Sequence, residues 1–315
     1  MRKPIVVVGS INLDLVAATP HIPRAGETVA GLSFQTFPGG KGANQAVAAA
    51  RLGGEVSMVG KLGSDAFAAQ LRESLEESGV RTEAVGIVPG PSGVALITTG
   101  PAGENAIVVV AGANGQLAPA DLEANLDLIR SAGILMTQLE TPFETIECLA
   151  AIAVRERIPL MLDPAPARPL PASLLKCVEW LTPNETEIWP MLGRSAQELT
   201  SKALEEAAGT LLAQGTRNVI LKLGARGCYL ATAEGTRQLI PAYKVRAVDT
   251  TAAGDAFNGA LAVALLRGDD AVRSASWASA VAAISVTRHG AQPSMPSAAE
   301  VTRFLEETEG VKLSS

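Results

Sequence analysis

The fold of this chain is decided by residues 134–162, which read ILMTQLETPFETIECLAAIAVRERIPLML. The apolar run at 134–139 predicts a buried strand, residues 143–155 predict a helix, and residues 160–162 predict a second strand. A strand, a helix and another strand form the unit that joins neighbouring strands of a parallel sheet. We therefore expect an α/β protein with three αβα layers and a mainly parallel central sheet.

The same alternation continues on both sides of this unit. A strand at 180–181, a helix at 196–214, a strand at 218–223 and a hairpin at 228–240 follow it. Near the N-terminus, residues 5–8 (IVVV) form an uninterrupted β-branched run, as expected for a strand buried on both faces of a parallel sheet. Ligands of open α/β sheets collect where such strands end.

Two segments outside this alternation predict a small separate sheet. Residues 27–37 are rich in Thr, Val and Phe, and the apolar runs 94–97 and 106–110 flank a turn with Gly, Pro and Asn. Because so small a sheet cannot bury both faces against one core, we expect a lid formed by insertions at about 12–38 and 93–112 of a single domain that spans the chain. Pairing of two lids would cover their apolar area, which predicts a homodimer.

Composition narrows the classes of function. A chain of 315 residues with 47% hydrophobic and 18% charged side chains can bury a large core, which argues against disorder. A net charge of −6 without a basic block argues against a nucleic-acid partner. Cys148, Cys177 and Cys228 lack metal-site spacing and fit a reducing compartment. The N-terminal apolar run is too short for a signal peptide or membrane span, so we expect a cytoplasmic protein that acts on small molecules.

Residues 249–260 (DTTAAGDAFNGA) carry the clearest functional pattern. A turn of small residues precedes an apolar helix expected to open near Gly254, so the free N–H groups of residues 252–255 point outward. With the helix dipole they favour a phosphate or a developing negative charge, and Asp255 supplies a base beside it. The alternative is that Asp255 only stabilises the first helical turn. Residue 258 is Asn, so a reciprocal capping box is missing.

A family resemblance rests on this pattern and on a second one. DTTAAGDAFNGA is similar to the C-terminal signature of the ribokinase family of ATP-dependent sugar kinases, and GGKGANQ at residues 39–45 resembles its N-terminal signature. The match covers essentially the whole chain. It implies a ribokinase-like fold and transfer of the ATP γ-phosphoryl group to the 5-hydroxyl of D-ribose, with magnesium bridging the nucleotide phosphates. Asp255 is then the general base, and the N–H groups of Ala252, Ala253 and Gly254 form an anion hole.

Several polar residues are candidates for the sugar site. Asn12 and Asp14 follow the first strand, and we expect both to project from a loop; a turn that bonds its own backbone is the alternative. The glycine-rich segment before a helix expected at 45–52 is not a Walker A loop, and a plain hinge is its alternative. For Glu140, which follows a strand, the alternative is a solvated charge. The resemblance implies sugar binding by Asn12, Asp14, Gly40, Lys41, Gly42, Asn44, Glu140 and Asp255.

The resemblance also implies a nucleotide site. Thr182, Pro183 and Glu185 read as a helix capping box, which leaves Asn184 and Glu187 unexplained. The loop at 222–227 follows a strand and suits a phosphate neighbourhood, with a plain β-turn as the alternative. Ser279 stands where residues near the adenine are often larger in the family. The implied nucleotide residues are Asn184, Glu187, Lys222, Gly224, Arg226, Gly227, Gly254 and Ser279.

A third implied site binds a monovalent cation, potassium. The family wraps this ion with two turns, one near residue 249 and the other at 288–294, and many of the ligands are backbone carbonyls. The implied residues are Asp249, Thr251, Ser285, Arg288, Gly290 and Ser294.

One departure and two rival functions remain open at this point. Asp163 stands where the resemblance leads us to expect Asn. A kinase of the same fold that acts on another sugar or on a nucleoside is the nearest rival, although only 3% of the chain is aromatic and a nucleoside site calls for stacking surface. A sugar-binding regulator without catalysis is the second rival, but it has no chemical need for Gly254 and Asp255.

Overall fold

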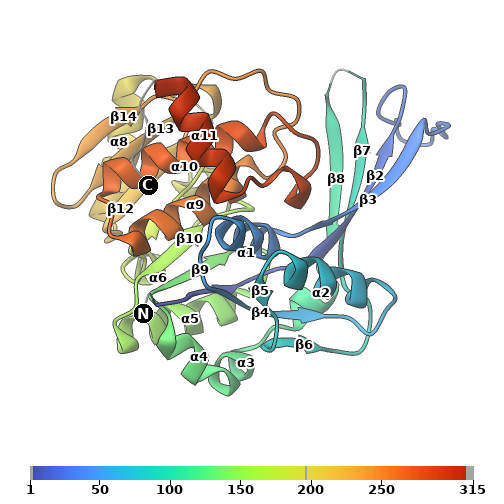
Figure 1. The fold of residues 1–315 in the computed structure, drawn as a ribbon, viewed down its shortest axis with the longest axis horizontal. Helices are drawn as coiled ribbons and strands as arrows, with labels where there is room; N and C mark the ends of the chain where they lie inside the picture. The colour runs from blue at the N-terminus through green and yellow to red at the C-terminus, as the bar shows by residue number, and fades with distance from the viewer. Residues whose placement is uncertain (1–2, 102, 196, 310–315) are drawn as a thin grey trace.

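A computed structural model describes residues 3–101, 103–195 and 197–309 of this chain. A ten-stranded sheet runs through the body, and a separate four-stranded sheet stands out beside it (Figure 1). Within these described ranges, no helix has both the length and the apolarity needed to cross a membrane.

The large sheet is mainly parallel, as predicted. Its strand order is β14-β13-β12-β11-β10-β9-β1-β4-β5, with β6 paired to β4, and only the β12–β13 and β13–β14 pairs are antiparallel. The strands are β1 (Ile5–Val8), β4 (Val56–Leu62), β5 (Val80–Arg81), β6 (Val85–Ile87), β9 (Ile134–Gln138), β10 (Leu160–Asp163), β11 (Trp180–Leu181), β12 (Asn218–Lys222), β13 (Cys228–Thr232) and β14 (Arg237–Ile240).

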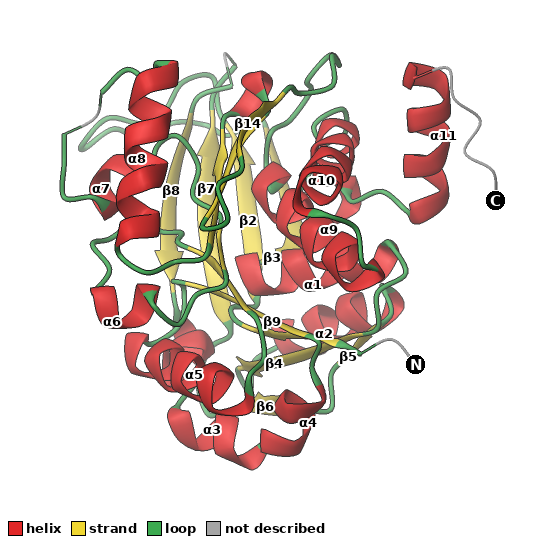
Figure 2. Cartoon of the chain, turned by 90° about the vertical axis from the view of Figure 1, so that its left-hand side faces the viewer, coloured by secondary structure: helices red, strands yellow, loops and turns green. Residues whose placement is uncertain are grey.

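Strand β1 lies between two cores. Ile5 and Val7 belong to the core on one face of the sheet, and Val6 and Val8 belong to the core on the other face. Alternate side chains of a strand point to opposite faces, so a strand covered on both sides needs apolar residues at every position. The uninterrupted β-branched run therefore follows from its central place in the sheet, and the three-layer prediction is confirmed (Figure 2).

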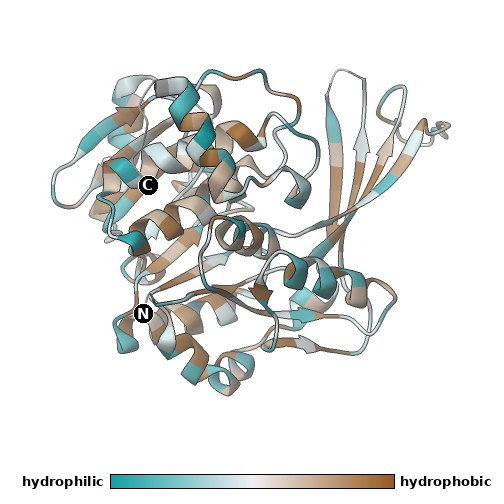
Figure 3. Cartoon of the chain, viewed as in Figure 1, coloured by the Kyte–Doolittle hydropathy of each residue, from teal (hydrophilic) through white to brown (hydrophobic). Residues whose placement is uncertain are grey.

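The two helix layers pack on these two cores, and Figure 3 shows the hydrophobic residues concentrated in the strands between them. The first layer contains α1 (Lys41–Arg51), α2 (Phe67–Glu77), α9 (Ala253–Arg267), α10 (Ala271–Ser285) and α11 (Ala298–Glu309). The second contains α3 (Pro119–Ala124), α4 (Leu126–Ser131), α5 (Phe143–Glu156), α6 (Ala172–Leu175), α7 (Ile188–Met191) and α8 (Ser201–Ala213).

The small sheet has the order β3-β2-β7-β8 and is formed by β2 (Asn12–Ala18), β3 (Ser33–Gly39), β7 (Gly93–Thr99) and β8 (Asn105–Val110). The strand expected at 27–37 begins only at Ser33, because its partner β2 ends at Ala18, which is paired with Ser33. Asn12 and Asp14 lie within β2 and not in a loop as expected, so both side chains share one face of this strand.

Three helix starts differ from the sequence prediction. Helix α1 begins at Lys41, four residues early, because Gly40 adopts a φ of 88° and ends the preceding strand. Helix α8 begins at Ser201, where the Thr200 side chain accepts a hydrogen bond from the Ala203 N–H, and residue 196 of the predicted helix lies outside the described residues.

The third difference concerns the segment after β11. No helix begins at Pro183, so the predicted capping box does not form, and the next helix is α7. The side chain of Asn184 bonds the N–H groups of Thr186 and Glu187 instead, at 2.9 and 3.0 Å. Such a turn satisfies the backbone locally and leaves Glu185 free for another contact.

Helices α1 and α9 pack with their backbones close together at Gly259. A Cβ atom at this position would lie 2.7 Å from the Cβ of Ala48 and 2.8 Å from the carbonyl oxygen of Gln45. We expect Gly259→Ala to lower the free energy of unfolding by about 1–3 kcal/mol through overpacking, although Ala favours helices. Urea unfolding measures this change.

The matched control is Gly209→Ala in α8, where nothing lies within 4 Å of the added Cβ atom. Here only helix propensity acts, so we expect stabilisation of up to about 1 kcal/mol. Equal effects of the two substitutions would show that close packing of α1 on α9 does not limit residue 259.

Candidate active site

The candidate site lies at one edge of the large sheet, where the carboxyl ends of parallel strands meet. Ser10 follows β1, Glu140 follows β9, Asp163 ends β10 and Lys222 ends β12. The first turns of α1 and α9 lie at the same edge, because hydrogen bonds link Asn44 and Gln45 of α1 to Asp255 of α9. Segments that are more than 200 residues apart in the chain therefore form one site.

Asp255 is a buried carboxylate held by two amides. Its side chain lies in the first turn of α9 and accepts 3.0 Å hydrogen bonds from Asn44 Nδ2 at one oxygen and from Gln45 Nε2 at the other. The residue is only 5% exposed. Stabilisation of the first helical turn does not explain this orientation, because both oxygens are bonded to α1.

Burial raises the pKa of Asp255 to about 6. The nearby Lys41 ammonium lowers this pKa, the charge of Asp163 raises it, and the hydrogen bonds from Asn44 and Gln45 lower it. The carboxylate is thus ionised at neutral pH but more basic than an exposed aspartate, which suits a general base.

The predicted sugar-binding side chains lie next to Asp255. Burial, followed by the charges of Glu140 and Asp255, raises the pKa of Asp14 to about 7, while Lys41 lowers it. Glu140 accepts hydrogen bonds from the Ser10 hydroxyl at 2.6 Å and from the Lys41 N–H at 3.2 Å. Asp14, Glu140 and Asp255 all interact with the ammonium group of Lys41. Because carboxylate oxygens accept hydrogen bonds from hydroxyl groups, the cluster can bind a ligand that offers several of them.

Asn12 is oriented by a residue that the sequence did not single out. The Asn114 side chain donates to Asn12 Oδ1 at 2.7 Å and also bonds both backbone groups of Ile11. Asn114 comes from the 3₁₀ helix at Gly112–Gln116, after β8. No local pattern marks it, because its role depends on contact with a segment about 100 residues earlier.

The glycines at 40 and 42 serve close packing of α1 on the chain between β1 and β2. A Cβ atom at Gly40 would lie 2.7 Å from the Asn12 nitrogen, and one at Gly42 would lie 2.7 Å from the Ser10 nitrogen. Both positions therefore exclude a side chain. They fix the N-terminus of α1, and with it Lys41 and Asn44, at the site.

A cavity of about 610 Å³ opens beside the N-terminus of α9. Its lining includes six of the predicted nucleotide residues, namely Asn184, Lys222, Gly224, Gly227, Gly254 and Ser279, together with Ala253 of the proposed anion hole. The rest of the lining is largely apolar, and no sequence pattern predicted it, because it comes from a coil and from the C-terminal end of α10 with the residue that caps it: Ala242, Tyr243, Val245, Ala247, Ala282, Ala283 and Val286.

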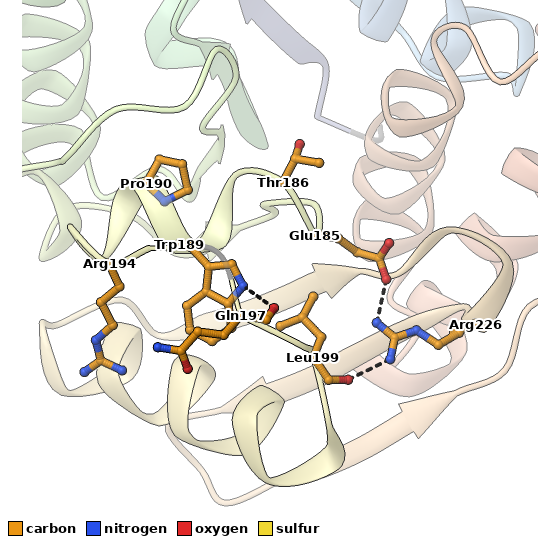
Figure 4. A pocket seen from close by; sticks show the side chains of 8 residues that line it. All are labelled: Glu185, Thr186, Trp189, Pro190, Arg194, Gln197, Leu199 and Arg226. Atoms are coloured by element: carbon orange, nitrogen blue, oxygen red, sulfur yellow. Dashed lines mark hydrogen bonds and ion pairs between the residues drawn. The ribbon is translucent and has the colours of Figure 1, made fainter. Parts of the chain in front are cut away.

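Two predicted nucleotide residues do not line this cavity. Arg226 donates to Glu185 at 2.5 Å and to the Leu199 carbonyl at 2.7 Å, and it lines a separate cavity of about 400 Å³ (Figure 4). Glu187 is 8% exposed and accepts 2.8 Å hydrogen bonds from the backbone N–H and the side chain of Asn184. Burial raises the pKa of Glu187, Lys222 lowers it and Asp163 raises it.

The predicted cation-binding turns come together at Asp249. Its carboxylate accepts 2.9 Å hydrogen bonds from the Thr251 N–H at one oxygen and from the Gly290 N–H at the other. The hydroxyls of Ser285 and Ser294 are buried and 3.1 Å apart. Arg288 instead pairs with Glu300 at 2.6 Å, so only its backbone is available to an ion in these turns.

The chain matches the model of the pfkB family carbohydrate kinase over residues 2–298. It is 41% identical to the ribokinase of Bacillus subtilis, with 96% of this chain and 99% of the relative covered. It is 36% identical to the deoxyribokinase of Salmonella typhi, with 96% and 98% covered.

A solved structure of the Arabidopsis thaliana ribokinase complexed with ribose and ATP superposes with a TM-score of 0.88. It is 33% identical, with 97% of this chain and 99% of that chain covered. Fold, family model and relatives agree over nearly the whole length. This chain belongs to the pfkB family of carbohydrate kinases.

Proposed function

We propose that this protein is a ribokinase, which transfers the γ-phosphoryl group of ATP to the 5-hydroxyl of D-ribose. One observation carries the proposal: Asp255 directly follows Gly254, which lines the 610 Å³ cavity, and its charge acts on Asp14, which the charge of Glu140 also affects. A carboxylate base thus lies where a nucleotide and a sugar can meet. The ribose and ATP bound by the Arabidopsis relative support the choice of both substrates.

The cavity suits the magnesium complex of ATP. Ala242, Val245 and Ala282 in its lining offer an apolar surface for the adenine ring, and Lys222 and Gly254 supply polar groups to the same lining. We place the phosphates there, since the backbone N–H groups at a helix N-terminus and an ammonium both attract anions. Magnesium enters as part of the nucleotide substrate, and we place it toward Asn184 and Glu187.

Catalysis then consists of positioning and charge stabilisation. The oxygen of the sugar 5-hydroxyl attacks the γ-phosphorus while Asp255 accepts the proton of this hydroxyl. ADP leaves on the opposite side of the phosphorus, in line with the attacking oxygen. The backbone N–H groups of Ala252, Ala253 and Gly254 stabilise the charge on the transferring oxygens. Ala252 has a φ of 59°, which turns this segment into the first turn of α9.

Potassium fits the two turns at Asp249. Burial raises the pKa of Asp249, but hydrogen bonds from Thr251 and Gly290 lower it more, so the carboxylate is ionised. The buried hydroxyls of Ser285 and Ser294 and the carbonyls of these turns are oxygen donors of the kind that replace the water shell of potassium. Ion binding there supplies positive charge next to the segment that forms the anion hole, and Asp249, Thr251, Ser285, Gly290 and Ser294 would hold it.

We propose that the four-stranded sheet closes over the sugar, because it carries Asn12 and Asp14 at the end of β2 nearest the site. Closure excludes water and so suppresses hydrolysis of ATP. Its outer part exposes apolar side chains, including Phe34 at 64%, Ile107 at 52% and Val108 at 59%. Because monomeric proteins seldom expose many large apolar side chains on one small sheet, we infer that two lids pair in a homodimer.

Substrate choice is tested by coupled ADP-release assays with D-ribose, 2-deoxy-D-ribose, hexoses and nucleosides, each with and without potassium. We expect the highest kcat/KM for D-ribose, activation by potassium, and little ATP hydrolysis without sugar. A preference for 2-deoxy-D-ribose or for a nucleoside would replace the proposed substrate. Fast hydrolysis without any sugar would contradict closure of the lid.

The base is tested by Asp255→Asn. We expect kcat to fall by about 100- to 10,000-fold with the fold intact, because the amide cannot accept the proton. Asp127→Asn, at an exposed position of α4, is the matched control and should be neutral. Turnover of Asp255→Asn near the wild-type value would remove Asp255 from the base role.

The pH profile gives a further check on the same carboxylates. Asp14 and Asp255, with pKa values raised to about 7 and about 6, must both be ionised to bind the sugar and to accept its proton. We expect kcat/KM for ribose to be constant above these values and to fall by up to about 100-fold per pH unit below both. A profile that is flat down to pH 5 would contradict this assignment.

The lid dimer is tested by Ile107→Asp, which places a charge in the proposed contact. We expect light scattering to show a dimer for the wild type and a monomer for this variant, because desolvation of an unpaired charge is costly. Val154→Asp is the control, since Val154 is 57% exposed on α5 and outside the lid. A monomeric wild type would rule out the dimer.

A further inference from the structure

Asp163 is a buried carboxylate with no part in the chemistry proposed above. It ends β10 and is 3% exposed. One oxygen accepts a hydrogen bond from Lys222 Nζ at 3.0 Å, and the other accepts one from Gln45 Nε2 at 2.9 Å. Removal of a carboxylate from water is costly, and these two hydrogen bonds offset part of the cost. They therefore hold the Asp163 side chain in one position.

Gln45 connects Asp163 to the proposed base. Its Nε2 group also donates to Asp255 at 3.0 Å, and its Oε1 atom accepts from Gln138 Nε2 at 2.8 Å. The two N–H groups of the Gln45 amide thus bond the two carboxylates. The hydrogen bond from Gln138 to Oε1 fixes the orientation of this amide, so its nitrogen faces Asp163 and Asp255. Asp163 and Asp255 are therefore linked through one amide group, that of Gln45.

Lys222 connects Asp163 to the nucleotide cavity. The lysine lines this cavity, and its Nζ atom lies 3.2 Å from the position of a Cβ atom on Gly254. Its side chain is only 11% exposed, so the ammonium is confined at the N-terminus of α9. The ion pair with Asp163 keeps the ammonium at this place and partly neutralises it.

We propose that Asp163 is a positioning residue for phosphoryl transfer, which orients Lys222 and Gln45 together and weakens the binding of the nucleotide before reaction. This inference rests on the proposed function, because it assigns the cavity to ATP. The negative charge of Asp163 repels phosphate and competes with it for Lys222. Asp163 therefore orients Lys222 and Gln45 for the reaction at the cost of weaker binding of ATP and ADP.

The charge of Asp163 also acts on Asp255. The charged side chains around that base and its neighbours are Lys41 on α1, Asp14 on β2, Glu140 after β9 and Asp163 at the end of β10, with Lys222 of β12 paired to Asp163. Asp163 is one cause of the raised pKa of Asp255. Loss of the charge also frees Lys222, so both effects lower the pKa of the base.

The decisive substitution is Asp163→Asn, which keeps the size of the side chain but removes its charge. The amide has one acceptor where Lys222 and Gln45 present two donors, so one contact is lost. We expect ADP to bind at least about threefold more tightly, kcat at high pH to fall by about tenfold or more, and the lower of the two acid steps of kcat/KM, that of Asp255, to move about 0.5 to 1 pH unit lower. Isothermal titration with ADP and pH-dependent kinetics measure these changes.

Asp121→Asn is the matched control. Asp121 is an aspartate on α3 that pairs with Lys61 at 2.6 Å, so the same chemical change is made outside the site. We expect a change in thermal stability but none in ADP affinity or in the pH profile. If Asp163 contributed only to folding, Asp163→Asn would, like Asp121→Asn, change thermal stability without changing ADP affinity or the pH profile.

A double-variant cycle shows whether Asp163 acts through Lys222. In a Lys222→Met background, Asp163→Asn should have a much smaller effect on ADP affinity, because the two residues are coupled. Unchanged ADP affinity and an unmoved pH profile in Asp163→Asn would overturn the inference. Tighter ADP binding in this variant, with no ribose-dependent turnover in the wild type, would support the inference and overturn ribose as the substrate.

Discussion

The site depends on the close contact of α1 with α9. Only because residue 259 has no side chain can the two helices approach until Asn44 and Gln45 of one reach Asp255 of the other. Carboxylates in the first turn of a helix are common. Asp255 differs because it is only 5% exposed and because hydrogen bonds from a second helix fix the orientation of its side chain. The contact thus converts a local feature of α9 into a base with a defined direction and a raised pKa.

The same contact explains why sugar and nucleotide residues come from opposite ends of the chain. Helix α1 follows β3 directly and carries Lys41 toward Asp14 and Glu140, whereas α9 borders the cavity that contains Lys222. Parallel strands place their carboxyl ends at one edge, and β1, β9, β10 and β12 each deliver a polar residue there. Most of the fold therefore serves as a rigid frame for a few side chains.

Much of the fold could be predicted from the sequence because its signals are local. The β-branched run at 5–8 and the β-α-β pattern of residues 134–162 each indicate strands that are buried on both faces. The observed strands and helix match the expected bounds to within one residue. The start of β3 and the lining at 242–247 depend on partners distant in the sequence, so no local pattern marks them.

For the site, Asp255 was singled out because small residues and an acid at a helix start form an unusual pattern, whereas Asn44 was expected from the family resemblance of residues 39–45. Gln45, Asn114 and Asp163 were not assigned a role, since amides and acids at such positions are common, and only their contacts distinguish them. Arg226 was expected at the nucleotide, but a nearby acid, Glu185, and the Leu199 carbonyl direct its side chain into a different cavity.

The separation of these residues along the chain has a consequence during synthesis on the ribosome. Asn44, Gln45 and Asp163 are made long before Asp255, so the inner surface of α1 has no covering helix until the last fifth of the protein emerges. Up to that moment the contacts among the earlier residues, such as Gln45 with Asp163 and Ser10 with Glu140, can form, but the bonds of Asn44 and Gln45 to Asp255 cannot. The nascent chain thus acquires its apolar cover and its base in a single late step, when α9 docks.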